Sequence, residues 1–321
     1  MRICILGAGG VFGTNLAAYL LSQKHEVMGI GRSPKKPPCF SLGVEYPYHT
    51  YHIGSEFEYV IHTIRQWEPD VIVNFAAQGE GAASWGSDNW RFYDTNCTAL
   101  VRLVSAISGH FVQIGSSEVY GSVDKPVDEN YPLNPTSPYS VSKAAFDLHL
   151  VAMHKVKGLN INIIRPSNCY APGQQLHRII PKALICGLTG RPLPLHGGGA
   201  SRKSYLHATD LSRAILMVIE KGERGQIYNV GPDEPTLVRE VVAHCLAQVS
   251  LASVTTSWKR IVIESPERLG QDSCYWLDSS KFKALGWKQE IDWEEGLADM
   301  HDWLEQYPEL LSMPTEFVMR A

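Results

Sequence analysis

The sequence predicts an α/β protein in which a doubly wound parallel sheet is joined to a smaller, interleaved α/β domain. Short apolar runs rich in β-branched residues alternate with helix-length segments, as in successive βαβ units. The first such run leads directly into three evenly spaced glycines, which mark a turn from strand to helix. The length of 321 residues, with 44% hydrophobic content, is enough to bury a large core.

The chain opens with the apolar run 2–6, followed by Gly7-x-x-Gly10-x-x-Gly13 and the helical pattern of 14–21. Such a turn brings backbone amides and the positive end of a helix close to a pyrophosphate. Gly10 allows close approach of the phosphates, and Gly13 allows the helix to pack tightly on the strand. The spacing alone is a weak signal, but its context predicts a dinucleotide site of the Rossmann type.

Further strand-like runs and helical intervals follow in alternation, which predicts a parallel doubly wound sheet. Strands are expected at 25–30, 70–74, 110–114 and 159–164, and helices at 59–66, 91–108 and 139–157. After Arg165 the chain becomes richer in glycine and proline, so 191–199 is expected to form loops. Nearer the carboxyl end we expect a strand and helix at 204–221 and two helices at 278–286 and 293–307.

These elements predict two interleaved domains. Residues 1–167, together with part of 204–232, are assigned to a Rossmann domain that binds the dinucleotide. Residues 168–203 and 233–321 are assigned to a smaller domain. Its glycine-rich and proline-rich loops are expected to carry the substrate pocket.

The composition excludes several classes of function. The formal charge is −4, from 29 basic and 33 acidic residues, and no run of lysine and arginine offers a surface for nucleic acid. The first strand begins at once and no apolar stretch reaches membrane-spanning length, so we expect a cytoplasmic protein without a membrane partner. Seven cysteines without a Cys-x-x-Cys pair indicate reduced thiols and no metal site, and His49 and His52 are expected to be loop residues.

Tyr139 and Lys143 form a Tyr-x-x-x-Lys pair in the first turns of the helix that follows Pro138. On a helix these side chains share one face, so the ammonium can lower the pKa of the phenol and make it a usable base. Pairs at this spacing also arise by chance on exposed helices. The preceding dinucleotide signal favours the functional interpretation.

Taken together, the motifs resemble those of the extended short-chain dehydrogenases that act on nucleotide sugars, the epimerase and dehydratase family. The matching segments are Gly7-x-x-Gly10-x-x-Gly13, Asn74-x-Ala76-Ala77, Asn96, Ser116-Ser117-Glu118, Tyr139-x-x-x-Lys143 and Arg165-Pro166-Ser167-Asn168. The later stretch 192–210, with Arg268 and 278–281, resembles the substrate half of the same family. The resemblance therefore extends over nearly the whole chain.

The resemblance implies catalytic roles for Tyr139, Lys143 and the trio Ser116-Ser117-Glu118. Tyr139 would take a proton from a sugar hydroxyl while hydride leaves C4 for the nicotinamide, with Lys143 on the nicotinamide ribose and Ser116 on the hydroxyl. At the position of Glu118, 4-epimerases usually carry a small residue, whereas dehydratases place the base that removes the C5 proton. We therefore predict an elimination, with helix capping by Glu118 as the structural alternative.

Ser117 departs from the pattern of the dTDP-glucose 4,6-dehydratases, in which an aspartic acid protonates the departing C6 hydroxyl. Serine is a far weaker acid, so either Ser117 relays a proton, or water or another side chain supplies it. Serine-containing trios also occur in GDP-mannose 4,6-dehydratases and UDP-glucuronate decarboxylases. Ser117 therefore does not exclude dehydration.

Arg32 stands at the end of the second strand, where an acidic residue commonly binds the adenosine ribose. Arg32 could stack on adenine or pair with a 2′-phosphate. On physical grounds this favours NADP, because an unpaired acidic residue would repel that phosphate and none is present. The resemblance to dehydratases that retain NAD favours NAD, which is the cofactor we expect. The expected cofactor-binding residues are Gly7, Gly10, Phe12, Gly13, Arg32, Ala76, Asn96, Tyr139, Lys143 and Pro166.

The resemblance also implies a nucleotide-sugar substrate, which we expect to be UDP-linked. Arg202 and Arg268 are candidates for its diphosphate, because a guanidinium can bind phosphate in a bidentate pose. Asn168 resembles an asparagine that donates to the diphosphate, and His196 stands where an aromatic ring often lies against the base. Each has an ordinary loop residue as its alternative. The expected substrate contacts are Ser84, Glu118, Asn168, His196, Arg202 and Arg268.

The predicted function is that of a lyase, a redox-neutral dehydratase of an NDP-hexose or hexosamine, acting as a homodimer through helices 91–108 and 139–157. The trio, the chain length and the loop 78–81 suggest a specific reaction, the 5,6-dehydration of UDP-N-acetylglucosamine, as in biosynthesis of the antibiotic tunicamycin. In that reaction hydride returns to C4 and leaves an exo-glycal. A 4,6-dehydratase, a UDP-glucuronate decarboxylase, an epimerase and a non-enzymatic NAD(P)-sensing regulator stay open as alternatives.

Overall fold

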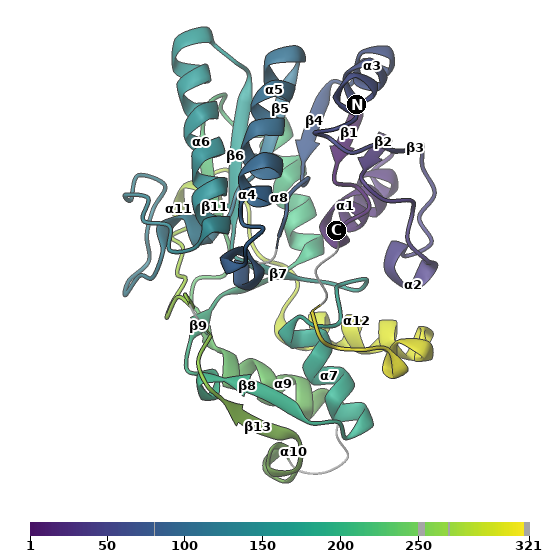
Figure 1. Ribbon diagram of the computed structural model, residues 1–321, viewed down its shortest axis with the longest axis vertical. Helices are drawn as coiled ribbons and strands as arrows, with labels where there is room; N and C mark the ends of the chain where they lie inside the picture. The colour runs from purple at the N-terminus through teal and green to yellow at the C-terminus, as the bar shows by residue number, and fades with distance from the viewer. Residues whose placement is uncertain (80, 250–253, 269, 318–321) are drawn as a thin grey trace.

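A seven-stranded parallel sheet forms the centre of the larger domain (Figure 1). The computed structural model describes residues 1–79, 81–249, 254–268 and 270–317. The strand order is β11-β6-β5-β4-β1-β2-β3, so the chain winds outward in both directions from the centre. The strands are β1 (Arg2–Leu6), β2 (Glu26–Gly31), β3 (Tyr48–Thr50), β4 (Val71–Asn74), β5 (His110–Ile114), β6 (Ile161–Pro166) and β11 (Ile227–Val230). This sheet confirms the predicted doubly wound Rossmann architecture.

Helices cover both faces of the sheet (Figure 1). One layer contains α1 (Val11–Ser22) and α8 (Ala208–Lys221), and the other contains α3 (Phe57–Trp67), α5 (Ala99–Ala106) and α6 (Pro138–Lys157). Side chains of β1 alternate between the two layers, because successive residues of a strand point to opposite faces. Ile3 and Ile5 pack with α1 and α8, whereas Cys4 and Leu6 pack with α3 and α5.

The segment predicted as one helix over 91–108 is divided in the structure. α4 (Trp90–Tyr93) passes into a π-helical turn, η2 (Asp94–Thr98), before α5 begins. The wide turn buries the side chain of Asn96, which is 1% exposed. Single π turns inside helices occur frequently at functional sites. The apolar pattern continues through this turn, so the sequence alone predicted an uninterrupted helix.

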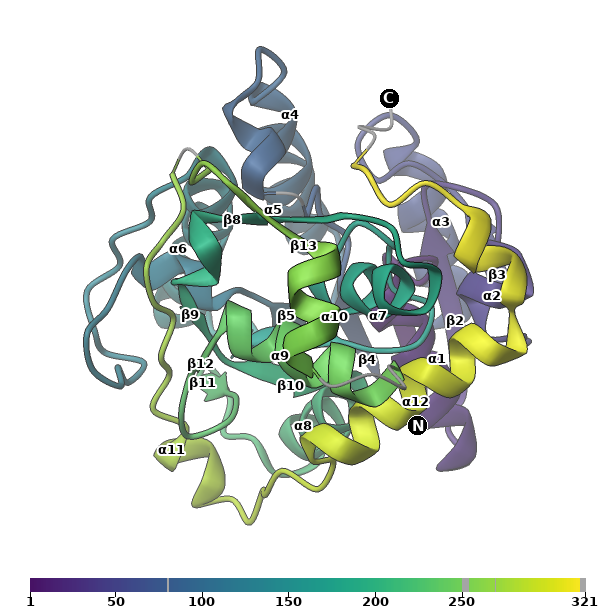
Figure 2. The same ribbon diagram turned by 90° about the horizontal axis from the view of Figure 1, so that it is seen from below.

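The smaller domain lies below the sheet in Figure 1 and is seen from below in Figure 2. Its core is shared by α7 (Ile179–Thr189), α9 (Val238–Val249) and α12 (Trp293–Gln306). Among the described residues, three small sheets pair β7 (Asn168–Tyr170) with β10 (Tyr205–His207), β9 (Arg202–Lys203) with β12 (Thr236–Leu237), and β8 (Leu193–His196) with β13 (Val262–Ser265). The short elements are α2 (Pro38–Ser41), α10 (Val254–Ile261), α11 (Ser280–Lys283), η1 (Gly81–Trp85), η3 (Ser117–Tyr120), η4 (Gly197–Gly199) and η5 (Pro308–Ser312).

The chain crosses between the domains more than once. After the smaller domain is largely built, the segment 272–287 returns to the larger one, where the amide of Val123 donates to the carbonyl oxygen of Cys274. Further along, Phe282 and Trp287 are buried in the same cluster as α1 and α8. The two domains are therefore interleaved, while the exact boundaries predicted from the sequence stay a prediction.

Three further local predictions were wrong, two of them because pairing with another strand decides the structure. Residues 193–196, expected in a loop, form β8 by pairing with β13. His49, also expected in a loop, lies in the edge strand β3, whereas His52 does lie in the loop that follows. The helix predicted over 278–286 is only the short α11, and Gly286 has a φ of +97°.

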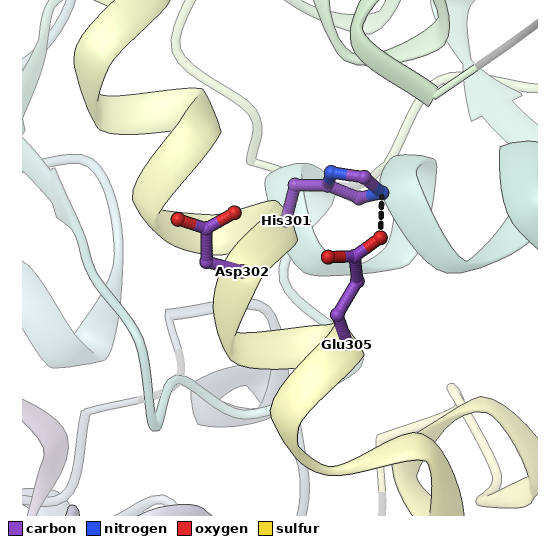
Figure 3. A group of neighbouring side chains, drawn as sticks. All are labelled: His301, Asp302 and Glu305. Atoms are coloured by element: carbon purple, nitrogen blue, oxygen red, sulfur yellow. Dashed lines mark ion pairs between the residues drawn. The ribbon is translucent and has the colours of Figure 1, made fainter.

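Three polar side chains, His301, Asp302 and Glu305, lie close together on α12 (Figure 3). The Nε2 of His301 lies 3.8 Å from an oxygen of Glu305, one turn further along the helix. Exposed pairs at this spacing contribute little to stability. Ordinary pairing along a helix is sufficient to explain this group.

All seven cysteines carry free thiols, which confirms the predicted absence of disulfides. Burial raises the pKa of Cys4 to about 12 and also raises the pKa of the other six cysteines, so these thiols are not reactive nucleophiles. Within the described ranges, no helix combines the length and the apolar character needed to cross a membrane. The cytoplasmic location stays a prediction.

Candidate active site

The glycine turn between β1 and α1 leaves no room for side chains. Gly7 has a φ of +76°, and a Cβ there would lie 2.6 Å from the backbone nitrogen of Ala76. A Cβ on Gly13 would lie 2.6 Å from the carbonyl oxygen of Gly7. Gly10 directly precedes α1, whose first turn carries no acidic side chain. A bare backbone cradle at an uncapped helix N-terminus fits the pyrophosphate of a dinucleotide.

Asn96 fixes the loop that follows β4 against the helix α6. Its Oδ1 accepts a hydrogen bond from the amide of Gln78 at 2.7 Å. Its Nδ2 donates to the carbonyl oxygen of Gln78 at 3.1 Å and to Oγ of Ser142 at 2.9 Å. The amide of Ala76 donates to Oδ1 of Asn74 at 3.0 Å in the same loop. Asn96 therefore shapes the wall beside the predicted dinucleotide site.

The other predicted cofactor residues lie at the ends of strands or at the start of α1. Phe12 is half-buried in the first turn of α1, and Pro166 is the buried last residue of β6. Arg32 is exposed just after β2 and borders a cavity of about 250 Å³. The other residues that line this cavity are His52, Gln78, Trp90, Arg91, Asp94 and Thr95.

The trio Ser116-Ser117-Glu118, predicted to be catalytic, follows the carboxyl end of β5, near the middle of the sheet. Ser116 and Ser117 are 8% and 2% exposed, whereas Glu118 is partly exposed. Oγ of Ser116 accepts from the amide of Glu118 at 3.2 Å, so the cap of η3 is Ser116. A Cβ on Gly81 would lie 3.4 Å from Oε2 of Glu118 and 3.8 Å from a ring carbon of Tyr139. The carboxylate and the phenol ring are therefore neighbours.

The position of Tyr139 is set by the start of α6. Pro138 occupies the first turn, and Ser137 forms a capping box with Ser140, in which each side chain bonds to the other's backbone amide. The ring of Tyr139 packs edge-on against Phe92, with ring centres 6.4 Å apart. The phenol is thus held between the start of α6 and α4.

Lys143 is buried rather than displayed on the surface of α6. Its Nζ donates to the carbonyl oxygen of Ile114 at 2.6 Å, and the residue is 4% exposed. Burial lowers the pKa of Lys143 to about 8, and the nearby Asp147 opposes this lowering. Asp147 is itself paired with Arg165, with 2.9 Å between Oδ2 and Nε. The burial of Lys143 therefore argues against a chance Tyr-x-x-x-Lys pair on an exposed helix.

The predicted substrate residues His196, Arg202 and Arg268 all meet one loop, 266–276. Nδ1 of His196 lies 2.9 Å from the carbonyl oxygen of Pro266, and the amide of Arg202 donates to the loop at 2.7 Å. Arg268 belongs to the loop and is exposed, as are His196 and Arg202. His196 and Arg202 thus contact the segment to which Arg268 belongs, and the contacts of all three with substrate stay predictions.

The segment η1 connects this loop to the trio. Ser84 is fully buried, and its Oγ donates to the carbonyl oxygen of Gly81 at 2.6 Å. A Cβ on Gly270 would lie 2.6 Å from the Trp85 ring, so η1 also touches the loop 266–276. Asn168 is half-buried at the start of β7. Glu80, in the loop singled out from the sequence, lies outside the described residues.

Sequence reasoning missed a buried cluster beside the trio, formed by Lys203, Asp272 and Tyr275. Nζ of Lys203 donates to the carbonyl oxygen of Asp272 at 2.9 Å and lies 3.4 Å from the centre of the Tyr275 ring. Oη of Tyr275 donates to Oδ2 of Asp272 at 2.7 Å. Burial and the charge of Glu118 raise the pKa of Tyr275, so this phenol stays neutral. No local signal marked this lysine, because β9 has only two residues and the burial of Lys203 beside the exposed Arg202 is seen only in the structure.

A sequence profile described as the NAD dependent epimerase/dehydratase family matches residues 3–231. This range contains the glycine turn, the trio and the Tyr139–Lys143 pair. The chain belongs to this family. Membership confirms the predicted resemblance and confirms NAD as the cofactor. It also identifies the protein as an enzyme of an epimerase and dehydratase family.

Several curated relatives of this family member are 4,6-dehydratases. A dTDP-glucose 4,6-dehydratase from Streptomyces niveus is 34% identical over 240 residues, which cover 73% of this chain and 69% of that protein. A trifunctional UDP-glucose 4,6-dehydratase, 3,5-epimerase and reductase from Arabidopsis thaliana is 33% identical over 249 residues, or 75% of this chain. The chain spans only 36% of the length of that plant protein.

Solved structures of the family share the whole fold. The dTDP-glucose 4,6-dehydratase of Streptomyces venezuelae, solved with NAD, has a TM-score of 0.87 at 28% identity, covering 97% of this chain and 98% of that one. A Thermus thermophilus UDP-glucose 4-epimerase with NAD has a TM-score of 0.86 at 24% identity, covering 96% and 100%. The second likeness shows the fold alone. The roles of the individual site residues stay predictions.

Proposed function

We propose that this enzyme is a redox-neutral nucleotide-sugar dehydratase, which eliminates water across C5 and C6 after transient oxidation at C4. The observation that carries the proposal is the position of Glu118, whose carboxylate lies next to Gly81 together with the ring of Tyr139. A carboxylate beside the C4 base can remove a C5 proton that the neighbouring ketone has acidified. The 4,6-dehydratases at 33% and 34% identity support the same class of reaction.

Each catalytic side chain has a separate task in this proposal. Tyr139 takes the proton of the C4 hydroxyl, and Ser116 holds that hydroxyl in place. Lys143, on the same helix face as Tyr139, provides a positive charge that favours the phenolate. Glu118 then removes the C5 proton. NAD, when bound at the glycine turn, supplies the chemistry of accepting a hydride from C4 and returning it.

The site to which hydride returns decides the product. Similarity to the 4,6-dehydratases supports return to C6 and a 4-keto-6-deoxy sugar, which is the finer reaction that we propose. The 5,6-dehydration of UDP-N-acetylglucosamine, expected first from the sequence, is the second candidate. It is favoured by the buried Ser117, which replaces the acid of the dTDP-glucose enzymes. A UDP-linked substrate and a role in antibiotic biosynthesis stay predictions.

The test is an incubation of the purified protein and NAD with four sugar nucleotides in deuterated water, followed by proton NMR and mass spectrometry. The substrates are dTDP-glucose, UDP-glucose, UDP-N-acetylglucosamine and UDP-glucuronate. Loss of water with a new C6 methyl group supports the 4,6-dehydratase, and loss of water with vinyl protons supports the 5,6-dehydratase. Loss of carbon dioxide, simple epimerisation, or no change in any of the four would contradict the proposal.

We also propose a homodimer that associates through the helices α4, α5 and α6. Apolar side chains are exposed on α6, at 37% for Val141, 58% for Leu148 and 83% for Val156, and exposed apolar patches mark association surfaces. Light scattering at micromolar concentration should give the mass of a dimer. Leu148→Arg should give a monomer, and Leu188→Arg, at a position on α7 that is 37% exposed, should not. A monomeric wild-type protein would contradict the proposal.

A further inference from the structure

The end of β2 differs from that of most dinucleotide sites, because no acidic residue stands there. The strand ends at Gly31, and Arg32 follows it. In Rossmann folds a carboxylate near this place commonly accepts a hydrogen bond from the 2′-hydroxyl of the adenosine ribose, whereas a nearby arginine accommodates the 2′-phosphate of NADP. The family to which this chain belongs is nevertheless NAD dependent. Recognition of the ribose of NAD therefore requires an acceptor from another element.

The phenol oxygen of Tyr48 occupies the place that a side chain at the end of β2 would take. A Cβ on Gly31 would lie 3.4 Å from the amide nitrogen of Gly9, so a side chain there would point onto the glycine turn. The same Cβ would overlap the phenol oxygen of Tyr48. A Cβ on Gly9 would lie 2.6 Å from that oxygen. Tyr48 Oη therefore lies between the end of β2 and the turn that fits the pyrophosphate.

Two glycines of β2 make room for the ring of Tyr48. Tyr48 begins the edge strand β3 and pairs with Gly29 (Figure 1). A Cβ on Gly29 would lie 3.1 Å from Cδ2 of Tyr48 and 2.6 Å from a ring carbon of Tyr46. Gly29 and Gly31 are two residues apart and so face the same side of the sheet. The ring of Tyr46 packs edge-on against that of Tyr48, with ring centres 6.3 Å apart. The phenol is thus held over β2 in a defined position.

The hydrogen bonding of Tyr48 leaves an acceptor on its oxygen. The hydroxyl donates to the carbonyl oxygen of Ser33 at 2.7 Å. A phenol has one proton to donate, and its oxygen can accept as well. Burial raises the pKa of Tyr48, so the phenol keeps its proton near neutral pH. Tyr48 therefore presents a neutral acceptor at the place where a carboxylate is common. A ribose hydroxyl can donate to this oxygen, whereas an ionised phosphate brings only further acceptors.

Arg32 is the residue that favours the opposite choice of cofactor, because a guanidinium binds phosphate well. It is exposed and borders the cavity of about 250 Å³ described above. That cavity is also lined by Arg91 and by the carboxylate of Asp94, which would oppose a phosphate in the same space. The surroundings of Arg32 are therefore of mixed charge and do not form a purely cationic phosphate site.

We propose that Tyr48 determines the preference of this enzyme for NAD over NADP, with its hydroxyl oxygen accepting a hydrogen bond from the 2′-hydroxyl of the adenosine ribose. The phenol takes the place of the usual acidic side chain, and a 2′-phosphate would meet an acceptor oxygen there. This role concerns the cofactor alone and is independent of the sugar-nucleotide reaction proposed above.

The test removes one hydroxyl from the protein and one from the ligand. Tyr48→Phe keeps the ring and deletes the oxygen, and 2′-deoxy-NAD lacks the ribose hydroxyl. Affinities are measured by displacement of the fluorescent analogue etheno-NAD. Wild type should bind 2′-deoxy-NAD about tenfold more weakly than NAD, whereas Tyr48→Phe should bind the two equally. The matched control is Tyr51→Phe, just after β3, whose ring stacks between His49 and Tyr59 and which should behave as wild type.

This cycle separates a direct contact from a role in packing. If Tyr48 only supports the fold, Tyr48→Phe should weaken NAD and 2′-deoxy-NAD by the same factor, and that result would overturn the proposal. The wild-type protein provides an arm that needs no variant, because equal affinity for NAD and 2′-deoxy-NAD would overturn the proposal as well. The melting temperature without added nucleotide shows that each variant is folded.

NADP provides the second readout. Tyr48→Ala removes the ring and the acceptor beside Arg32, so the ratio of NADP affinity to NAD affinity should rise at least about tenfold. Adding Arg32→Ala should reverse this rise. The nucleotide that co-purifies with the wild-type protein, released by acid and identified by chromatography, should be NAD. Bound NADP in the wild type, or an unchanged affinity ratio in Tyr48→Ala, would overturn the proposal.

Discussion

Replacing Arg165 by methionine should destabilise the protein by about 3–5 kcal/mol, because the change leaves a buried carboxylate unpaired. The side chains of Arg165 and Asp147 are 3% and 0% exposed, and Nε lies 2.9 Å from Oδ2. Arg165 also donates to Oη of Tyr120 at 2.8 Å. Oδ1 of Asp147 has no hydrogen-bond partner within the part of the chain that the structure describes. The guanidinium is therefore the main compensation for burying this carboxylate.

The expected magnitude follows from the ion-pair distance of 2.9 Å. Two unit charges at this distance attract by about 6 kcal/mol at an effective dielectric constant of about 20. Most of this attraction offsets the desolvation of both ions, and loss of one partner leaves the desolvation of the other uncompensated. With roughly 2 cal/mol/K of unfolding entropy per residue over 321 residues, the melting temperature should fall by about 4–8 °C.

Thermal and urea unfolding at neutral pH measure this effect. Asp88→Asn is the control, because its pair with Arg91 is exposed and spans 3.4 Å, and it should change the free energy of unfolding by less than about 1 kcal/mol. The double variant Asp147→Leu with Arg165→Met should recover much of the loss, since it removes both buried charges. A single Arg165→Met variant within about 1 kcal/mol of wild type would refute the reasoning.

The remaining predictions concern catalysis, pH and cofactor binding. Tyr139→Phe should abolish oxidation at C4, whereas Glu118→Gln should still oxidise C4 but lose water at least about a hundredfold more slowly. The absorbance of reduced nicotinamide and NMR of the product separate the two, and normal dehydration by Glu118→Gln would contradict the elimination. Lys143 should make the free energy of unfolding rise as the pH increases from about 8 to 10.5. In this window the unfolded state still binds the proton of Lys143, whereas the folded state has released it. Urea titrations of wild type and Lys143→Met should diverge by up to about 3 kcal/mol across this window, and parallel curves would show that the lysine is not buried. Gly13→Ala should remove the rise in melting temperature that NAD causes, because its Cβ would lie 2.6 Å from a carbonyl oxygen of the glycine turn. Gly86→Ala, with its nearest contact at 3.4 Å, is the control, and an unchanged NAD response in Gly13→Ala would count against the cradle.

Much of the larger domain could be predicted from the sequence because its signals are local. The central strands are buried on both faces and therefore read as continuous apolar runs, as in β4, where all the residues are buried. The glycine turn can be recognised from its residue types, because only glycine fits where Gly7 and Gly13 lie against neighbouring backbone. The trio and the Tyr139–Lys143 pair are likewise short motifs, each contained in a few consecutive residues.

The features that the sequence did not reveal depend on contacts between distant segments. β3 and β8 are short and are defined by their partners β2 and β13 rather than by their own pattern. Lys203 shows nothing in its local sequence that distinguishes it from a solvated lysine. Its environment is created by Asp272 and Tyr275, which reach it only in the folded chain. Hydrophobic periodicity and secondary-structure propensity carry no information on contacts between distant segments, so the buried cluster could be found only from the structure.

The return of 272–287 to the larger domain constrains the order in which the protein can mature. Phe282 and Trp287 are 0% and 3% exposed within the cluster that also contains β1, α1 and α8. Synthesis delivers the amino-terminal half first, and domains usually fold as they emerge. Here the hydrophobic core around the first strands is complete only after residues near the carboxyl end of the chain have been synthesised and packed against it. A ribosome-bound intermediate that ends near residue 231 would still expose apolar surface, so the nascent chain depends on rapid completion or on chaperones until α11 arrives.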